Sequence, residues 1–221
     1  MFGQSMGKNS LLLSLFALVT AGALATTYQL TRERIAEAEQ AAAARALLEI
    51  IPEEAHDNNL LADTRPVPAE ALDILGLKPG AEIHLARLNG DIQAAIIPAV
   101  APDGYSGDIR LIVGVNRNSS IAGVRVLTHN ETPGLGDKVE LKKSDWVLGF
   151  KGKSLEQPKP EDWRVKKDGG QFDQFTGATI TPRAVVKQVK KVLLFVREHR
   201  DLLFSDSRSE ENPEKAEGET L

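Results

Sequence analysis

A chain of 221 residues is long enough for one sizeable domain with appendages, or for two small ones. Its net charge of −4, without any Arg/Lys cluster interleaved with aromatic residues, argues against a nucleic-acid surface. The absence of cysteine excludes disulfides, iron–sulfur ligation, c-type haem attachment and cysteine-based zinc sites. No metal site is expected from the histidines, which lie far apart in the sequence: His56, His84, His129 and His199. Any redox chemistry would therefore need an organic cofactor.

The one long apolar run, LLLSLFALVTAGALATT at residues 11–27, is at the short end of what a membrane-spanning helix requires. Two interpretations stay open. The A-x-A pattern at Ala23–Ala25 is typical of a cleavable signal peptide. A retained anchor is favoured because apolar character continues to Tyr28 and strong helix formers follow directly. We expect the anchor, over residues 11–30, after a short cytoplasmic segment at residues 1–10.

The charges beside this run do not decide its orientation, since Lys8 precedes it while Arg32 and Arg34 follow it. A very short leading segment with a free amino group and one lysine is the usual arrangement when the N-terminus lies inside the cell. The lack of cysteine is compatible with an extracytoplasmic domain but does not demand one.

Residues 31–82 are expected to form a juxtamembrane helix and an irregular connection. The stretch TRERIAEAEQAAAARALLEII is dense in helix formers and is predicted to continue the apolar helix directly. The following segment, Ile51–Glu82, carries four prolines and scattered charge, which favours loops with one short helix near Ala69–Leu75.

A curved, largely antiparallel sheet is predicted from about Ile83 to Asn130. The segments IHLARL and DIQAAIIPAV flank Asn89-Gly90, a strong hairpin signal. The next pair, DIRLIVGVN and IAGVRVLTHN, is rich in β-branched residues and flanks the polar turn RNSS.

The last regular element is a helix predicted over Pro182–Phe204, in which apolar residues recur at helical spacing and are expected to pack on the sheet: Val185, Val189, Val192, Leu193 and Val196. Pro182 suits a first helical turn, and Thr181 is the expected N-cap. Residues 205–221 are polar, acidic and poor in apolar residues, so we expect a disordered tail. The whole chain is predicted to be one anchored α+β domain, with its globular part at residues 83–204.

Two glycine-containing stretches could carry chemistry. In ETPGLG, Pro133-Gly134 is the pair expected at the centre of a type II turn. It matches neither a Walker loop nor a dinucleotide fingerprint. Beyond a plain turn, the stretch could present backbone N–H groups to a flat or anionic ligand.

The second stretch is DQFTGATIT. Gly177 and Ala178 leave little side-chain bulk, and Thr179 lies close to the start of the final helix. The free N–H groups and the dipole at a helix N-terminus stabilise an anion, particularly a phosphate. These residues therefore indicate a phosphate seat beside hydroxyl groups, or only a turn and a helix cap. They do not identify a ligand.

A resemblance to a known family adds the ligand. DQFTGAT, Asp173–Thr179, resembles the D-x-x-[S/T]-G-A-T pattern of covalent FMN-binding domains, in which a flavin transferase joins FMN to the last threonine through a phosphoester. Longer stretches are similar to the G subunit of the Rnf electron-transport complex, which is itself similar to the C subunit of the sodium-pumping NADH:quinone reductase. These stretches are Trp163–Val192, His129–Lys138, Asp145–Leu155 and the N-terminal span.

Carried over to this sequence, the resemblance implies that Thr179 holds one covalent FMN per chain through its Oγ. It also implies that the phosphate and ribityl chain lie against Thr176, Gly177 and Ala178, and the flavin against Glu131, Thr132, Gly134 and Leu135. Asp173 belongs to the pattern and is expected to position the acceptor, or a metal, during attachment.

Four further residues have an ordinary interpretation and a functional one. Lys166 and Lys167 could favour a phosphate or an anionic reduced flavin, but we expect a solvated surface pair. Trp146 and Trp163 could stack on the flavin ring, but core packing is the expected role.

The resemblance implies a membrane-anchored electron carrier within a pump that couples ferredoxin–NAD electron transfer to ion movement. The chain would be a relay and not the place of hydride or ion transfer, so no catalytic residue is expected. The implied location is a bacterial inner membrane, with the FMN domain on the periplasmic side. The implied partners are the other Rnf subunits and a flavin transferase. Two alternatives stay open: an extracytoplasmic binding or scaffold module without covalent flavin, and a secreted flavoprotein released by cleavage after Ala25.

Overall fold

The computed structural model describes residues 2–205, so the predicted disordered tail lies outside the described residues except for Ser205. Helix α1 runs without interruption from Phe2 to Ile50, which confirms that the apolar run and the juxtamembrane segment form one helix. Within the described residues, one stretch is long and apolar enough to cross a membrane, Asn9–Ile35, and the protein buries none of it. A signal sequence would meet the same criterion. The chain divides into two compact units, residues 1–43 and residues 44–221, and the second contains the sheet.

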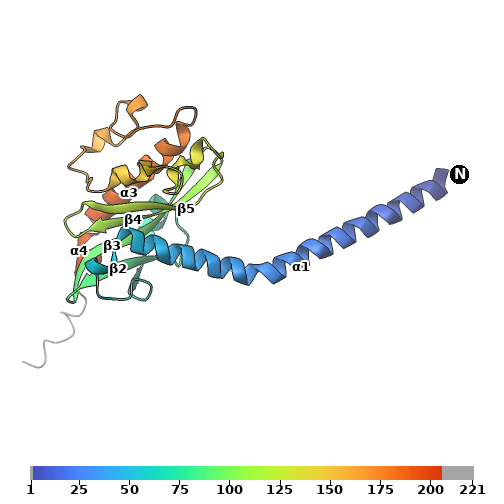
Figure 1. Cartoon of the computed structure of the whole chain (residues 1–221), viewed down its shortest axis with the longest axis horizontal. Helices are drawn as coiled ribbons and strands as arrows, with labels where there is room; N and C mark the ends of the chain where they lie inside the picture. Colours follow the sequence, from blue (N-terminus) through green and yellow to red (C-terminus); the bar gives the residue numbers. More distant parts are fainter. Residues whose placement is uncertain (1, 206–221) are drawn as a thin grey trace, which may run out of the picture. The chain divides into compact units, whose positions relative to one another are not determined.

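The second unit is built on one five-stranded antiparallel sheet in which each strand pairs with its neighbour in the sequence (Figure 1). The strands are β1 (Thr64–Pro66), β2 (Glu82–Leu88), β3 (Asp91–Gly104), β4 (Gly107–Asn116) and β5 (Ile121–Thr128). Register shifts interrupt the pairings of β2 with β3, β3 with β4, and β4 with β5. Such bulges bend the strands, so the sheet is curved and the predicted α+β class is confirmed.

The hairpin predicted at Asn89-Gly90 joins β2 to β3, and both residues have positive φ angles of 55° and 88°. These angles belong to a type I′ turn, whose twist matches that of the flanking strands. The short helix expected near residues 69–75 is also present, as a 3₁₀ turn at Ala69–Ala71 followed by α2 at Leu72–Leu75. Strand β1 was not predicted. It is an edge strand within the proline-rich connection, where Pro66 needs no second pairing partner.

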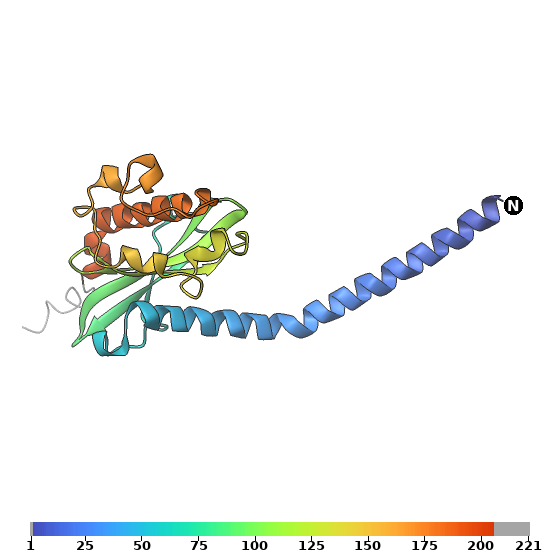
Figure 2. The same cartoon turned by 45° about the horizontal axis from the view of Figure 1, so that its top comes forward.

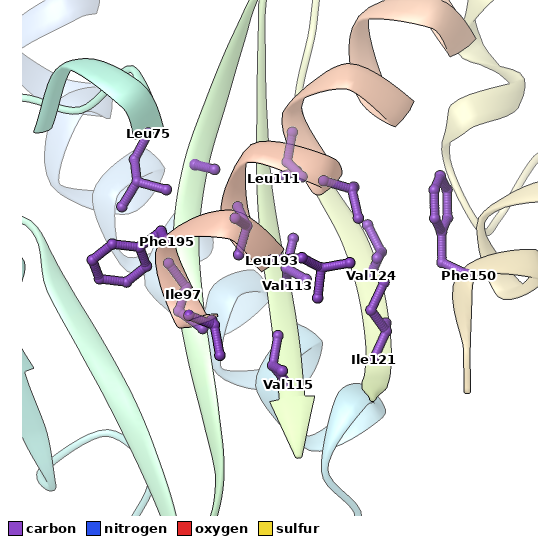
Figure 3. Packing of buried hydrophobic residues seen from close by; sticks show 14 of the residues in the cluster. Leu75, Ile97, Leu111, Val113, Val115, Ile121, Val124, Phe150, Leu193 and Phe195 are labelled. Atoms are coloured by element: carbon purple, nitrogen blue, oxygen red, sulfur yellow. The ribbon is translucent and has the colours of Figure 1, made fainter. Parts of the chain in front are cut away.

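Helix α3 (Ile180–Glu198) lies across one face of the sheet and supplies most of the helical part of the core (Figure 2). Every apolar residue predicted to face the sheet is buried, and Leu193 lies among side chains of β3 and β4 (Figure 3). The predicted helix is broken near its end, because α3 stops at Glu198 and α4 covers Arg200–Phe204. Short 3₁₀ turns follow β5, at Gly136–Val139 (η3), Asp145–Phe150 (η4), Pro160–Asp162 (η5) and Lys166–Asp168 (η6).

The opposite face of the sheet is covered by the last turns of α1, which belong to the second unit. Leu47, Ile50 and Ile51 are buried with apolar side chains of β2, β3 and β4. Ile50 fits against two glycines that pair across β4 and β5, Gly114 and Gly123. A Cβ at Gly114 would lie 2.2 Å from Ile50 Cγ2, so any larger residue would clash with the end of α1.

Candidate functional site

The two stretches singled out from the sequence fold into turns of the same kind. In the first, the N–H of Leu135 donates to the carbonyl of Thr132 at 3.1 Å, and Gly134 has a φ of +78°. This geometry confirms the type II turn predicted at Pro133-Gly134, whose third position requires a positive φ and hence glycine.

The second turn repeats this arrangement in FTGA. The N–H of Ala178 donates to the carbonyl of Phe175 at 3.1 Å, and Gly177 takes a φ of +81°. The two turns face each other, since a Cβ at Gly177 would lie 3.5 Å from Leu135 Cδ2. Two segments about forty residues apart in sequence thus form opposite walls of one site.

A pocket of about 340 Å³ opens between these walls. It is lined by Tyr105, Glu131, Thr132, Leu135, Gly136, Gly177, Ala178, Thr179, Ile180 and Thr181. The rim is apolar in part, because Tyr105, Leu135 and Ile180 are exposed. A concave site with apolar walls and a few convergent polar groups is typical of a cofactor pocket.

Thr179 takes the N-cap position of α3, and its side chain makes no capping hydrogen bond. The expectation that Thr181 would be the N-cap is therefore wrong, since the helix begins at Ile180, before Thr181. The first hydrogen bond of the helix runs from the Arg183 N–H to the Thr179 carbonyl, so the N–H groups of Ile180 and Thr181 have no partner within the helix, and Pro182 has no N–H. Ile180 and Thr181 line the pocket, which therefore lies at the positive end of the helix dipole. The Thr179 hydroxyl thus lies half-buried beside groups that stabilise an anion.

The floor of the pocket is a buried carboxylate. Glu131 is 4% exposed, and its Oε1 accepts a hydrogen bond from the N–H of Ser106 at 2.9 Å. Its Oε2 accepts from the Oγ1 of Thr181, which explains why that threonine is buried and not a cap. The N–H of Glu131 donates to His129 Nδ1 at 3.0 Å, and His129 Nε2 lies 2.7 Å from a carboxylate oxygen of Glu140. This chain of contacts fixes the Glu131 backbone.

An aromatic cluster supports the wall that carries Thr179. Phe172 and Phe175 are buried, with Phe172 stacked 4.8 Å from Phe150 and Phe175 edge-on to Trp146 at 5.2 Å. The indole N–H of Trp146 donates to the carbonyl of Asp173 at 2.8 Å, and Trp163 is 2% exposed. Neither tryptophan lines the pocket, so the core-packing interpretation is confirmed for Trp163, while half-buried Trp146 braces the loop.

The remaining residues of the sequence-based proposal lie around the pocket without lining it. Thr176 and Gly134 are exposed at the two turns. Asp173 is exposed and forms an ion pair with Lys166 at 2.5 Å, while Lys167 is exposed at the surface. The expected solvated lysine pair is therefore confirmed, with one lysine tied to the motif's aspartate.

Four lining residues were not predicted: Tyr105, Gly136, Ile180 and Thr181. Gly136 had a local signal, as the second glycine of ETPGLG. A Cβ there would lie 2.8 Å from the Thr181 hydroxyl and 2.9 Å from Glu131. Tyr105 comes from the β3–β4 turn and reaches the pocket only through the fold, which no local pattern reveals.

Comparison with known proteins identifies the family of the chain. Residues 104–194 match the FMN-binding domain family, and residues 1–50 match the RnfG N-terminal region. The chain is 51% identical over 215 residues to the G subunit of the ion-translocating oxidoreductase complex of Pseudomonas aeruginosa, covering 97% of this chain and 96% of that protein. It is 49% identical over 199 residues to the corresponding G subunit from Aliivibrio fischeri, covering 90% and 94%. The relative from Shewanella piezotolerans is 50% identical over 202 residues, covering 91% and 94%.

The fold, the pocket and the matched domain define an electron-transport flavoprotein that carries an FMN-binding domain behind an N-terminal apolar helix. The chain belongs to the family formed by the G subunits of ion-translocating oxidoreductase complexes.

Proposed function

We propose that the chain is anchored in the membrane by α1 and relays electrons through one FMN joined to Thr179 by a phosphoester. The observation that carries the proposal is the Thr179 hydroxyl. It lines the pocket, lies at the N-terminus of α3, and makes no capping hydrogen bond. A hydroxyl without such a bond keeps its oxygen lone pairs for covalent attachment.

The pocket residues fit FMN. Gly177 and Ala178 leave room for a phosphate and ribityl chain, and the first-turn N–H groups of α3 would stabilise the phosphate charge. A carboxylate can accept about four hydrogen bonds, and Glu131 accepts two from side chains and backbone within residues 2–205. Glu131 can therefore accept from a hydroxyl or N–H of the flavin, while Leu135 and Thr132 would lie against the ring.

When bound, FMN would supply one- and two-electron redox chemistry, and the chain's own residues would hold and orient it. A phosphoester lies far from the redox-active ring, so attachment prevents loss without changing the ring substituents. Thr176 and Gly134 would act through the geometry of their turns. Asp173, paired with Lys166, would be a surface feature that the transferase recognises.

The relatives are named as subunits of an ion-translocating oxidoreductase complex, which supports an assembly with other subunits for this chain. Its FMN domain would lie on the periplasmic side of a bacterial inner membrane. The chain would serve as a carrier within a ferredoxin–NAD oxidoreductase pump, with a flavin transferase as its assembly partner.

Covalent attachment is tested by co-expressing the chain with its flavin transferase and running it on a denaturing gel. The wild-type band should fluoresce yellow-green and its intact mass should rise by one FMN less one water. Thr179→Val should abolish both signals. Thr128→Val is the matched control, since Thr128 is exposed and lies outside both the pocket and the DQFTGAT pattern, and it should remain fluorescent. A dark wild-type band, or equal fluorescence of Thr179→Val, would contradict the phosphoester.

A further inference from the structure

A second pocket, which shares no residue with the flavin site, lies where the β4–β5 turn meets the junction of α3 and α4. Its volume is about 410 Å³, and it is lined by Asn118, Ser119, Ser154, Leu155, Glu156, Leu193, Arg197 and Arg200. Leu193 is buried and Leu155 half-buried, so the pocket has an apolar floor beneath polar side chains.

The two arginines provide more hydrogen-bond donors than the chain uses. Arg200 Nη1 donates to Ser119 Oγ at 2.8 Å, which leaves the other guanidinium N–H groups of Arg200 available. Within residues 2–205, Arg197 has no hydrogen bond or ion pair. Two guanidinium groups in one pocket repel each other, and an anion between them would remove that repulsion.

The uncharged groups of the pocket also have unused donors. Ser119 Oγ accepts from Arg200, so its own proton is free. Asn118 Oδ1 accepts from the N–H of Ser120 at 3.0 Å and from its hydroxyl at 2.7 Å, which leaves the Asn118 amide N–H₂ unspent. Ser154 Oγ accepts from two backbone N–H groups at 3.1 and 3.2 Å. The one carboxylate that lines the pocket, Glu156, does not balance this excess of donors.

Ser119 occupies the left-handed position of the β4–β5 turn, in which its N–H donates to the carbonyl of Asn116 at 2.8 Å. Its φ is +65°, in the left-handed region that glycine or asparagine usually occupies. Glycine would be easier to accommodate but would lack the hydroxyl that holds Arg200 over the pocket.

We propose that this pocket binds a phosphate group. A phosphate has three strong acceptor oxygens and about two negative charges. It can therefore engage two arginines and the donors of Asn118, Ser119 and Ser154 together, which a ligand with a single carboxylate would do less completely. The group can come from a soluble phosphate or from the headgroup of an anionic lipid, because both offer the same chemistry. The apolar floor would contact whatever carbon skeleton the phosphate carries.

The test uses the full chain with its flavin attached, reconstituted in nanodiscs of phosphatidylcholine and titrated calorimetrically with inorganic phosphate. The control titration is chloride at the same ionic strength. Phosphate should give a saturable heat that chloride does not. Arg197→Gln and Arg200→Gln should each weaken phosphate binding about tenfold, the loss expected for one charge-assisted contact.

Two further variants separate this pocket from general surface charge. Lys191→Gln removes an α3 cation that does not line the pocket and should bind phosphate like the wild type. Ser119→Gly relieves the strained φ, so it should fold at least as stably as the wild type while binding phosphate more weakly. Absence of saturable binding, or wild-type affinity in both arginine variants, would overturn the proposal.

The source of the phosphate is decided by repeating the titration in nanodiscs that contain phosphatidic acid. If lipid headgroups fill the pocket, added phosphate should give heat in phosphatidylcholine and none in the phosphatidic acid discs. If the ligand is soluble, both discs should give the same affinity. A failure of flavin attachment would leave all these results unchanged, because the two pockets share no residue.

Discussion

At the scale of single residues, the contact between Thr181 and Glu131 joins α3 to the floor of the pocket that Thr179 lines. Thr181→Val keeps the shape of the side chain but removes the hydroxyl that donates to the buried carboxylate. Losing a hydrogen bond to a charged group typically costs about 1.5–3 kcal/mol. We expect a fall of that size in the free energy of unfolding, measured by urea denaturation.

Thr181→Ser is the control for this variant, because it retains the hydroxyl and removes only a methyl group. It should lose distinctly less stability than Thr181→Val. Equal losses for the two variants would mean that the threonine methyl, and not the hydrogen bond to Glu131, stabilises this part of the core.

The threonines also show how far sequence predicts a site. The two turns, their glycines and the location of Thr179 beside them could be predicted from local patterns and the family motif, because turn geometry depends on adjacent residues. The role of Thr181 could not be predicted in this way. Its partner, Glu131, lies fifty residues earlier, and a buried contact of that range is set by tertiary packing, which overrides a local preference for capping.

At the scale of elements, the end of α1 packs against the sheet where two glycines, Gly114 and Gly123, leave room for Ile50. Gly114→Ala would place a Cβ 2.2 Å from Ile50 Cγ2, and such overpacking costs about 1–3 kcal/mol. Arg125 reinforces this contact, since its Nε lies 2.7 Å from the Glu49 carboxylate and its Nη2 3.2 Å from the Glu49 carbonyl. We expect Gly114→Ala to lower the free energy of unfolding measured in urea.

A double-mutant cycle tests whether the clash itself is responsible. Ile50→Ala removes the methyl group that Gly114→Ala would strike, so the double variant should be more stable than the sum of the single losses implies. Strictly additive losses would show that Gly114 matters for some reason other than its fit to Ile50.

A second element-scale contact links η6 to the first turns of α3. Arg183 binds both carboxylate oxygens of Asp168, at 2.6 and 2.9 Å, and this pairing holds the pKa of Asp168 below its ordinary value of 3.8. A lowered carboxylate pKa contributes stability that is complete above pH 3.8 and is lost as the pH falls through the folded-state pKa. The helix dipole disfavours the positive charge of Arg183 near the N-terminus of α3, and the negative charge of Asp168 offsets this effect.

Asp168→Asn should therefore have a lower melting temperature than the wild type at pH 7, and the difference in melting temperature should shrink toward zero as the pH falls below 3.8. Melting curves of both proteins, recorded from pH 7 to below pH 3.8, measure this difference. Glu161→Gln, an exposed carboxylate without an ion pair in residues 2–205, is the control and should show no such trend. A constant difference at every pH would rule out the ion pair as the cause.

The elements differ in how well their sequence predicts them. The β2–β3 hairpin and α3 were predictable because Asn89-Gly90 and the helical spacing of apolar residues act locally. Strand β1 was not predictable, since three residues that end in a proline carry no periodic signal and become a strand only by pairing with β2. The break between α3 and α4 likewise lacks glycine or proline, and falls at His199.

At the scale of the whole molecule, α1 combines an apolar stretch with an end that packs on the sheet, and this continuity favours a retained anchor. Its last turns are buried against the sheet, and Asn9–Ile35 is apolar and uncovered. Cleavage after Ala25 would leave the start of a long helix exposed, without any function for it. Intact-mass measurement of the purified chain should therefore find the N-terminal 25 residues present.

The orientation of the whole chain can be measured directly, because the sequence contains no cysteine and any introduced thiol is a unique label. Lys151→Cys places a thiol at an exposed position of the FMN domain, and Gly7→Cys places one before the apolar stretch. With the FMN domain in the periplasm, a membrane-impermeant maleimide should label Lys151→Cys in cells whose outer membrane is permeabilised. It should label Gly7→Cys only after lysis. The reverse pattern would put the domain in the cytoplasm, and labelling of both before lysis would mean that α1 does not span the membrane.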